Sequence, residues 1–246
     1  MQLIILAAGM GSRLKPITDN VPKGLVQVNG KSILEWQVDI ARQLDITDIC
    51  IVTGYKFECI DIPETTTIHN PQYNTTNMTH SLFCAQEYFK DEFVLSYGDI
   101  IYSKKIMEKL LDSNAPISIV VDDNWRSYWE DRFDNPLDDA ESLTIANNHI
   151  TSIGQKPTSL NDIESQYIGL MSFKNTGVAS LVDSHSEVRR HNPSIAQHMY
   201  MTDLLQYMIN KEINLTPVHI SSGWIEIDSL KDLELAKILL PKIILS

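Results

Sequence analysis

The order of β-rich and helical segments is the feature that most constrains the fold of this chain. Short runs of branched apolar residues alternate with stretches whose apolar residues recur at helical spacing: LIILA, ILEWQVDIARQL, DICIVTG, MTHSLFCAQEYF, FVLSYGD, SKKIMEKLLDS and ISIVVDD. This alternation is typical of βαβ units, in which helices cover both faces of a parallel sheet. We therefore expect an α/β fold, a Rossmann-like three-layer sandwich with a mixed but mostly parallel central sheet.

The pattern changes after Asp123. An irregular, aromatic and acidic stretch, NWRSYWEDRFDNPLDDAES, leads into SLTIANNHITSIG, which predicts a hairpin turning at Asn147 and Asn148. The alternation then resumes with YIGLMSF, two helical segments, LTPVHI and a closing helix from Ser229 to about Leu240. Since no repeat or linker divides the chain, we expect one domain, 1–246, with an inserted substrate lobe at about 123–166.

Composition narrows the possible partners. With 43% hydrophobic residues the 246-residue chain can bury a substantial core, and its formal charge of −12 argues against a nucleic-acid or anionic membrane surface. The three cysteines form no C-x-x-C pair, so reduced thiols are expected. The first apolar run is too short for a secretory signal or a membrane span. A cytoplasmic protein is expected, and a homo-oligomer is left open.

A glycine loop follows the first predicted strand in MQLIILAAGMGSRLKPITDNVPKGL. Ligands of parallel sheets bind just beyond the carboxyl ends of the strands. Gly9 and Gly11 would let the backbone approach a phosphate, and Arg13 would add a planar fork of donors. Pro22 would fix the chain before Lys23, whose ammonium could return to the loop. A purely structural turn is the alternative.

Two other phosphate-binding loops do not fit. A Rossmann fingerprint requires glycine or alanine where Leu14 stands, and a Walker A motif ending in NGKS requires glycine where Leu25 stands. The pair Asn29-Gly30 is better explained as a type I′ turn between LVQV and SIL.

The segments LAAGMGSRLKP and PKGLVQVNGKSILEW resemble the nucleotidyltransferase family that makes nucleoside-diphosphate sugars and CDP-alcohols. The pattern G-x-G-[ST]-R-L followed by P-K is specific to it. The resemblance implies a triphosphate held by Gly9, Gly11, Ser12, Arg13 and Lys23. It also implies backbone contacts near the base from Leu6, Ala7 and Ala8.

Carboxylates follow two further predicted strands. Asp99 comes directly after Gly98 at the end of FVLSYG, and Glu226 and Asp228 lie two residues apart in SGWIEIDSL, so they face the same way. The resemblance implies that Asp99 and Asp228 bind Mg²⁺ and that Gly98 lies beside the nucleotide. An acidic residue at a helix start is the alternative for Asp228.

The base-binding segment is expected in HNPQYNTTNMTHSLFCAQ. Asn77 and Ser81 could hydrogen-bond the edge of a base, and a helix N-cap is the alternative role for these residue types. The stretch is similar to that of family members that use CTP, such as phosphocholine and 2-aminoethylphosphonate cytidylyltransferases. CTP is therefore the nucleotide that the resemblance favours.

The inserted lobe is expected to bind the acceptor. Trp125 and Trp129 lie near Glu141 in the sequence, and aromatic faces with carboxylates suit an ammonium head group. Packing in the core is the alternative for the tryptophans. Arg132 could pair with a substrate carboxylate, and Tyr167 could line the same cleft.

Lys156 resembles the family's second lysine, which meets the phosphate of the acceptor. A solvated loop lysine is the alternative reading of this residue. With Arg13 and Lys23 it completes the predicted catalytic set.

Together these features predict a Mg²⁺-dependent cytidylyltransferase that joins CMP from CTP to a small phosphorylated, amine-bearing acceptor and releases pyrophosphate. Phosphocholine, aminoethylphosphonate and a phosphorylated amino acid such as phosphoglutamine are the candidate acceptors, and some members of this subset decorate surface polysaccharides. One alternative is a hexose-1-phosphate nucleotidylyltransferase, which YIGLMSF disfavours because the sugar enzymes carry an asparagine-glycine segment there. Another is a non-catalytic nucleotide-sensing subunit.

Overall fold

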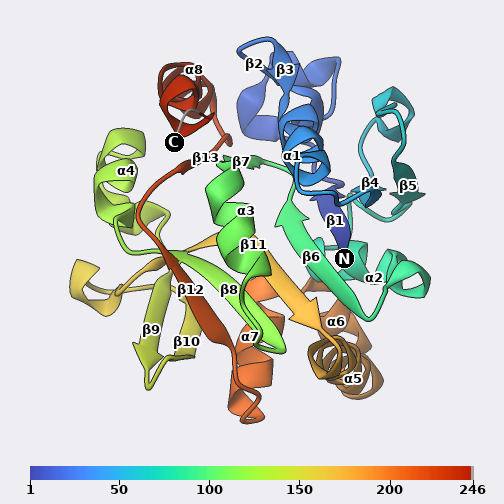
Figure 1. Cartoon of the computed structure of the whole chain (residues 1–246), viewed down its shortest axis with the longest axis vertical. Helices are drawn as coiled ribbons and strands as arrows, with labels where there is room; N and C mark the ends of the chain where they lie inside the picture. The colour runs from blue at the N-terminus through green and yellow to red at the C-terminus, as the bar shows by residue number, and fades with distance from the viewer. Residues whose placement is uncertain (245–246) are drawn as a thin grey trace.

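The computed structural model describes residues 1–244, so the last two residues of the predicted domain, 245 and 246, lie outside the described part. Helices cover both faces of a central seven-stranded sheet (Figure 1). The strand order is β12-β8-β11-β6-β1-β4-β5. The strands of this sheet are β1 (Gln2–Ala7), β4 (Asp48–Thr53), β5 (Thr66–His69), β6 (Glu92–Tyr97), β8 (Ile117–Asp122), β11 (Gln166–Lys174) and β12 (Thr216–Ile220).

The sheet is mostly parallel, as predicted. β1 pairs in parallel with β4 and β6, β4 with β5, and β8 with β12. Only β11 of the seven described strands runs the other way, and it lies between β6 and β8. All six residues of β1 are buried, which confirms the central parallel strand expected at Leu3–Leu6. The carboxyl ends of β1, β4 and β6 therefore open at one edge of the sheet.

Alternate residues of β1 enter two separate cores. Leu3 and Ile5 pack with apolar residues of α1, α3 and α8, whereas Ile4 and Leu6 pack with residues of α2, α5 and α7. Figure 1 shows α3 in front of the sheet and α5 to α7 behind it. The helices are α1 (Ile33–Arg42), α2 (Met78–Cys84), α3 (Lys104–Leu111), α4 (Trp125–Arg132), α5 (Thr176–His191), α6 (Pro193–His198), α7 (Met201–Asn210) and α8 (Leu230–Ile244).

Three antiparallel strand pairs accompany the main sheet: β2 (Gln27–Val28) with β3 (Lys31–Ser32), β9 (Ser142–Ala146) with β10 (His149–Gln155), and β7 (Ile100–Tyr102) with β13 (Trp224–Glu226). Both predicted hairpin turns are confirmed. Asn29 and Gly30 have φ of 50° and 92°, and Asn147 and Asn148 have φ of 50° and 60°, the left-handed values that a type I′ turn requires.

Two local expectations differ from the structure. The helix expected through MTHSLFCAQEYF ends at Cys84 and gives way to a 3₁₀ turn at Gln86–Tyr88, because Phe89 turns back to pack on Phe93 at a ring distance of 4.8 Å. Ser103 is at the N-cap position of α3 as expected, but it makes no side-chain cap bond.

Residues 123–166 form α4 and the β9–β10 hairpin beside the β8–β12 side of the sheet (Figure 1). Their role as a substrate lobe stays a prediction. Within residues 1–244, no helix has the length and apolar character needed to cross a membrane.

Candidate active site

A first cavity of about 300 Å³ lies beyond the carboxyl ends of β1 and β6. The structure brings together around it every residue that the sequence predicts to bind the nucleotide: Leu6, Ala7, Ala8, Gly9, Gly11, Ser12, Asn77, Ser81 and Gly98. Arg13, Lys23, Asp99 and Asp228 line it as well. Tyr73 and Thr76 also line the cavity and were not predicted.

The glycine loop is folded against the stem of Lys23. Gly11 has φ of 64°, and a Cβ at this position would lie 2.9 Å from the Cβ of Lys23. Thr18 Oγ1 donates a hydrogen bond of 2.8 Å to the Gly11 carbonyl. A larger residue at position 11 would therefore be strained and would push the lysine away from the loop.

A buried glutamine fixes the turn that carries Asp99. Gln37 of α1 donates from Nε2 to the carbonyl oxygens of Tyr97 and Ile100, at 2.8 and 2.7 Å, and accepts from Ser96 Oγ at 2.7 Å. Gly98 lies so close to β1 that a Cβ would be 2.6 Å from the Leu6 carbonyl oxygen. The turn between β6 and β7 is thus held on both sides, and Asp99 is aimed into the cavity.

Cations and carboxylates from distant parts of the chain meet at this point. Lys23 Nζ lies 2.8 Å from Asp99 Oδ2 and also donates to Asp228, and Arg13 Nη2 lies 2.8 Å from Asp228 Oδ2. Burial lowers the pKa of the Lys23 ammonium, but the two carboxylates outweigh it, so this pKa is raised above its usual range. Burial raises the pKa of Asp228, and Lys23 and Arg13 reverse that effect and lower it. Both partners are therefore charged at neutral pH.

Three carboxylates are close enough to share a metal ion. Asp99, Glu226 and Asp228 each offer an oxygen, and these oxygens lie within 4.8 Å of one another. Asp99 Oδ1 is buried and has no hydrogen-bond partner within the described chain. Oxygen ligands of this kind suit Mg²⁺, which keeps several waters and binds through one or two carboxylates together with phosphates. The residues present thus fit the predicted ion.

The two predicted base-binding residues also have structural roles. Asn77 is the N-cap of α2, its side chain accepting from Met78 N at 2.9 Å, and its amide donates to the His198 carbonyl at 3.3 Å. Ser81 Oγ accepts from the buried Asn70 at 2.9 Å. Asn77 is therefore a helix N-cap, which was the alternative role. Both Asn77 and Ser81 also line the first cavity.

A second cavity, of about 410 Å³, adjoins the first and shares Arg13, Met78, Asp99 and Asp228 with it. Its remaining wall is mainly aromatic and acidic. The aromatic residues are Tyr97, Trp129, Tyr167, Tyr200 and Trp224, and the further carboxylates are Asp139, Glu141 and Glu226. Arg13, at the shared boundary, is the one cation among the described residues that line this cavity.

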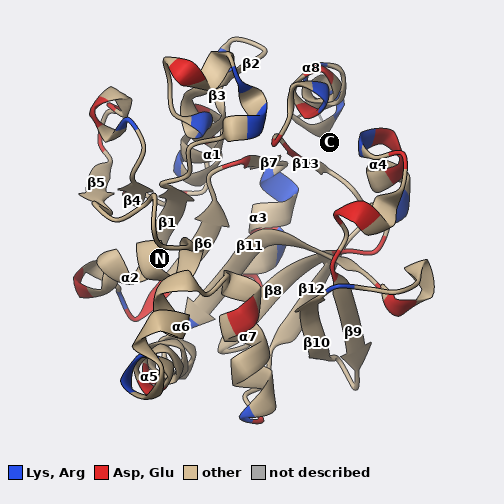
Figure 2. Cartoon of the chain, turned by 180° about the vertical axis from the view of Figure 1, so that it is seen from behind, with Lys and Arg blue, Asp and Glu red and all other residues tan. Residues whose placement is uncertain are grey.

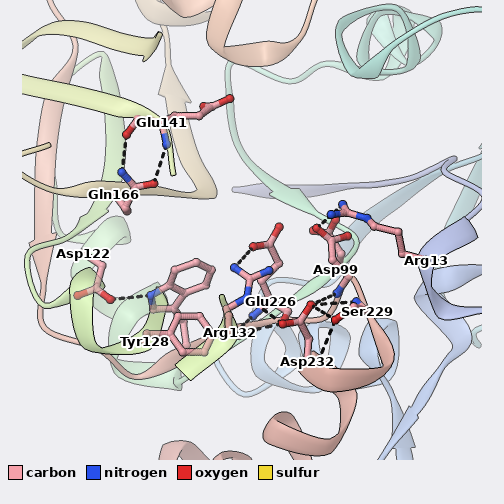
Figure 3. Close-up of polar contacts among 12 residues, drawn as sticks. Arg13, Asp99, Asp122, Tyr128, Arg132, Glu141, Gln166, Glu226, Ser229 and Asp232 are labelled. Atoms are coloured by element: carbon pink, nitrogen blue, oxygen red, sulfur yellow. Dashed lines mark hydrogen bonds and ion pairs between the residues drawn. The ribbon is translucent and has the colours of Figure 1, made fainter. Parts of the chain in front are cut away.

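Glu141 is held at the wall of the second cavity by Gln166, whose Oε1 accepts from the Glu141 backbone N–H at 3.3 Å (Figure 3). The residue lines the cavity and is exposed. Partial desolvation at the cavity wall, with repulsion from Asp139 and Asp203, raises the pKa of Glu141 to about 7. A cationic group bound here would favour the ionised form.

Trp125, Arg132 and Lys156 are absent from the described residues that line these two cavities. Helix α4 buries one stripe of residues, so Trp125 packs edge-on against Trp129 and the Arg132 side chain is fully enclosed between two carboxylates. Lys156 is exposed and lines a separate pocket that also contains Asp139 and Glu141. Arg132 therefore has protein partners where a substrate carboxylate was expected.

Several residues of the second cavity were not predicted from the sequence, among them Tyr200, Thr202 and Trp224. Tyr200 and Thr202 belong to a segment that is tied to α2, since Thr79 donates to the Tyr200 carbonyl at 3.0 Å. Trp224 donates from Nε1 to the buried Asp122 at 2.8 Å. For Trp224, its position two residues before Glu226 was the one feature of the sequence that could have placed it in the site.

The fold and this double cavity define a nucleotide-transferring enzyme, and comparison with known families agrees. Residues 3–210 match the MobA-like NTP transferase domain. The chain belongs to this family and is a nucleotidyltransferase, as the sequence predicts.

Among its relatives is the CTP:phosphoglutamine cytidylyltransferase of Campylobacter jejuni, which is 35% identical over 95% of this chain and 98% of its own length. The choline-phosphate cytidylyltransferase of Haemophilus influenzae is 28% identical over 94% of each chain. The solved CTP:phosphocholine cytidylyltransferase of Streptococcus pneumoniae superposes with a TM-score of 0.74 at 22% identity, covering 97% of this chain and 98% of the other. That likeness shows the shared fold.

Proposed function

We propose that this nucleotidyltransferase transfers CMP from CTP to the phosphate or phosphonate of a small amine-bearing acceptor and releases pyrophosphate. The observation that carries the proposal is the shared boundary of the two cavities, where Arg13, Asp99 and Asp228 lie between the glycine loop and the aromatic, acidic wall. A triphosphate in the first cavity and a phosphate in the second would meet there.

The proposed nucleotide is CTP. Two relatives that match over nearly the whole of both chains are named as cytidylyltransferases. Asn77 and Ser81 offer polar side chains on the wall of the first cavity at the start of α2. We propose that they face the base while the backbone of Leu6, Ala7 and Ala8 packs beside it.

The proposed acceptor carries an ammonium group. Asp139, Glu141 and Glu226 line the second cavity together with five aromatic rings, and this wall would favour a cationic head over an anionic one. We propose that Trp129, Glu141 and Tyr167 contact that head. A hexose 1-phosphate has no cation to match these carboxylates.

The acceptor supplies its own nucleophile. A phosphomonoester carries a charge of about −1.5 to −2 near neutral pH, so its oxygen can attack the α-phosphorus without a general base. Lys23, Arg13 and the N–H groups of the glycine loop would then position the triphosphate and offset repulsion between oxyanions. Mg²⁺ bound by Asp99 and Asp228 would neutralise the phosphate charge that develops as pyrophosphate leaves.

The test is pyrophosphate release in the presence of Mg²⁺, with CTP, UTP, dTTP, ATP and GTP each combined with phosphocholine, phosphoethanolamine, 2-aminoethylphosphonate, phosphorylated amino acids, glycerol phosphate and hexose 1-phosphates. We expect turnover with CTP and one amine-bearing acceptor. Turnover confined to a hexose 1-phosphate would refute the acceptor assignment. Nucleotide binding without turnover across the panel would favour a nucleotide-sensing role.

A further inference from the structure

We propose that Arg132 is a positioning residue that holds the proposed cation ligand Asp228, and its neighbour Glu226, in place for the cation and the triphosphate. The inference rests on the proposed use of a divalent cation at this site. It assigns to Arg132 a role other than contact with the acceptor.

The guanidinium of Arg132 joins the carboxylate at the end of β13 to a carboxylate in the first turn of α8. Nη1 lies 2.6 Å from Glu226 Oε2, and Nε lies 2.9 Å from Asp232 Oδ1 (Figure 3). The Arg132 side chain is fully buried, and that of Asp232 is 3% exposed. One planar fork thus fixes two acidic residues that lie six positions apart and on either side of Asp228.

Asp232, held by Arg132, in turn binds the backbone N–H of Asp228. Its second oxygen, Oδ2, accepts from the backbone N–H groups of Asp228 and Ser229, at 3.1 and 2.9 Å, and from Ser229 Oγ at 2.9 Å. Arg132 therefore acts on Asp228 through Asp232, and on Glu226 directly. Mutation of residues that orient metal ligands in this way typically costs about 10- to 100-fold in metal affinity or activity.

The surroundings of Arg132 favour a guanidinium over an ammonium. Its Cζ lies 5.4, 5.2 and 4.9 Å from the ring centroids of Tyr128, Trp129 and Phe133. Tyr128 also accepts from the Glu226 backbone N–H at 2.8 Å. A lysine offers a point charge on a flexible stem, so it lacks the planar fork that stacks on these rings and bonds Glu226 through Nη1 and Asp232 through Nε.

The test compares Arg132→Gln and Arg132→Lys with a control on the same helix, Arg126→Gln. Arg126 is exposed and pairs with Glu130 across one turn of α4, so its removal should leave the site unchanged. Binding of Mn²⁺ by the protein at a fixed concentration of CTP is measured from the EPR signal of free Mn²⁺, relative to the same concentration of CTP without protein. Acceptor KM, kcat and the thermal unfolding midpoint are measured on the same preparations.

We expect Arg132→Gln to weaken Mn²⁺ binding about 10- to 100-fold. Arg132→Lys should give a smaller loss, acceptor KM should change less than metal affinity in both variants, and Arg126→Gln should match the unmodified protein. If Arg132→Gln does not fold, the Lys variant decides the question. Native Mn²⁺ affinity in a folded Arg132 variant, or a rise in acceptor KM alone, would overturn the inference.

The same titration separates this inference from the proposed function. An unmodified protein that binds Mn²⁺ with CTP while the Arg132 variants bind it equally well would overturn only the positioning role. An unmodified protein that binds no Mn²⁺ with CTP would overturn both.

Discussion

At the scale of single residues, Lys23 connects the glycine loop to both proposed metal ligands. Lys23→Ala should lower kcat/KM for CTP by about 10²- to 10³-fold, because a preorganised cation is lost from the phosphate site. Steady-state kinetics measure the loss. Lys15→Ala, which removes an exposed lysine of the same loop, is the control and should retain activity. Equal activity in the two variants would contradict the role given to Lys23.

The raised pKa of Lys23 also predicts a pH profile. The ion-pair contribution to stability is fully present below the ordinary lysine pKa of 10.5 and is lost only as pH rises through the higher value of the folded protein. We therefore expect no loss of activity that depends on Lys23 between about pH 6 and pH 9. A descending limb in this range that disappears in Lys23→Arg would contradict this.

Glu141 should make acceptor binding depend on pH. Its pKa of about 7 means that the carboxylate becomes ionised as pH rises through neutrality, so KM for an amine-bearing acceptor should fall between about pH 6 and pH 8. Glu141→Gln should raise this KM and flatten its pH dependence, leaving only the titration of the acceptor's own phosphate. KM for CTP is the internal control. A Gln variant with an unchanged acceptor profile would exclude Glu141 from the head-group site.

At the scale of elements, α1 positions the turn between β6 and β7 through Gln37. Gln37→Leu would leave the Ile100 carbonyl without its side-chain donor and the Tyr97 carbonyl with only the longer bond of 3.3 Å from Ser96 Oγ, at a cost of about 1 to 3 kcal/mol for each buried group left unpaired. We expect a lower unfolding midpoint. We also expect a lower kcat, because the turn between β6 and β7, which carries Asp99, would no longer be held in place. Gln43→Leu, at the exposed end of the same helix, is the control. Native activity in a destabilised Gln37→Leu variant would show that the turn holds Asp99 without it.

The elements also show what local sequence can predict. Strand β1, the hairpin at Asn29-Gly30 and the hairpin at Asn147-Asn148 follow from periodicity and turn chemistry, which depend on neighbouring residues. The glycine loop and Asp99 were predictable because each follows a buried strand. Local sequence could not predict which side chains of α4 are buried, because Arg132 pairs with Asp232, which lies 100 residues away in the chain. The gathering of Tyr200 and Trp224 in the second cavity likewise depends on tertiary packing.

At the scale of the whole molecule, a chain of net charge −12 must gather cations locally to bind a triphosphate. Figure 2 shows acidic stretches around α4 and between β7 and the start of α8, the region that holds the three clustered carboxylates. Chelation by EDTA should therefore abolish turnover, and added Mg²⁺ should restore it.

Substitution of the two proposed metal ligands tests whether turnover depends on a cation at this site. Asp99→Asn and Asp228→Asn should each lower the rate by about 10²-fold or more. Asp112→Asn, at the exposed end of α3, is the matched control and should leave the rate unchanged. Full activity in EDTA would refute the use of a divalent cation.

We propose that the two cavities join CMP to a phosphorylated, amine-bearing acceptor, and ³¹P NMR of a single reaction can decide whether they do. With CTP, Mg²⁺ and the acceptor that gives turnover, we expect paired diphosphate resonances of a CDP-linked product and one equivalent of pyrophosphate. The same reaction with Asp228→Asn should show CTP almost unchanged. A product formed only from a hexose 1-phosphate, or a CTP spectrum that no acceptor alters, would refute the proposed reaction.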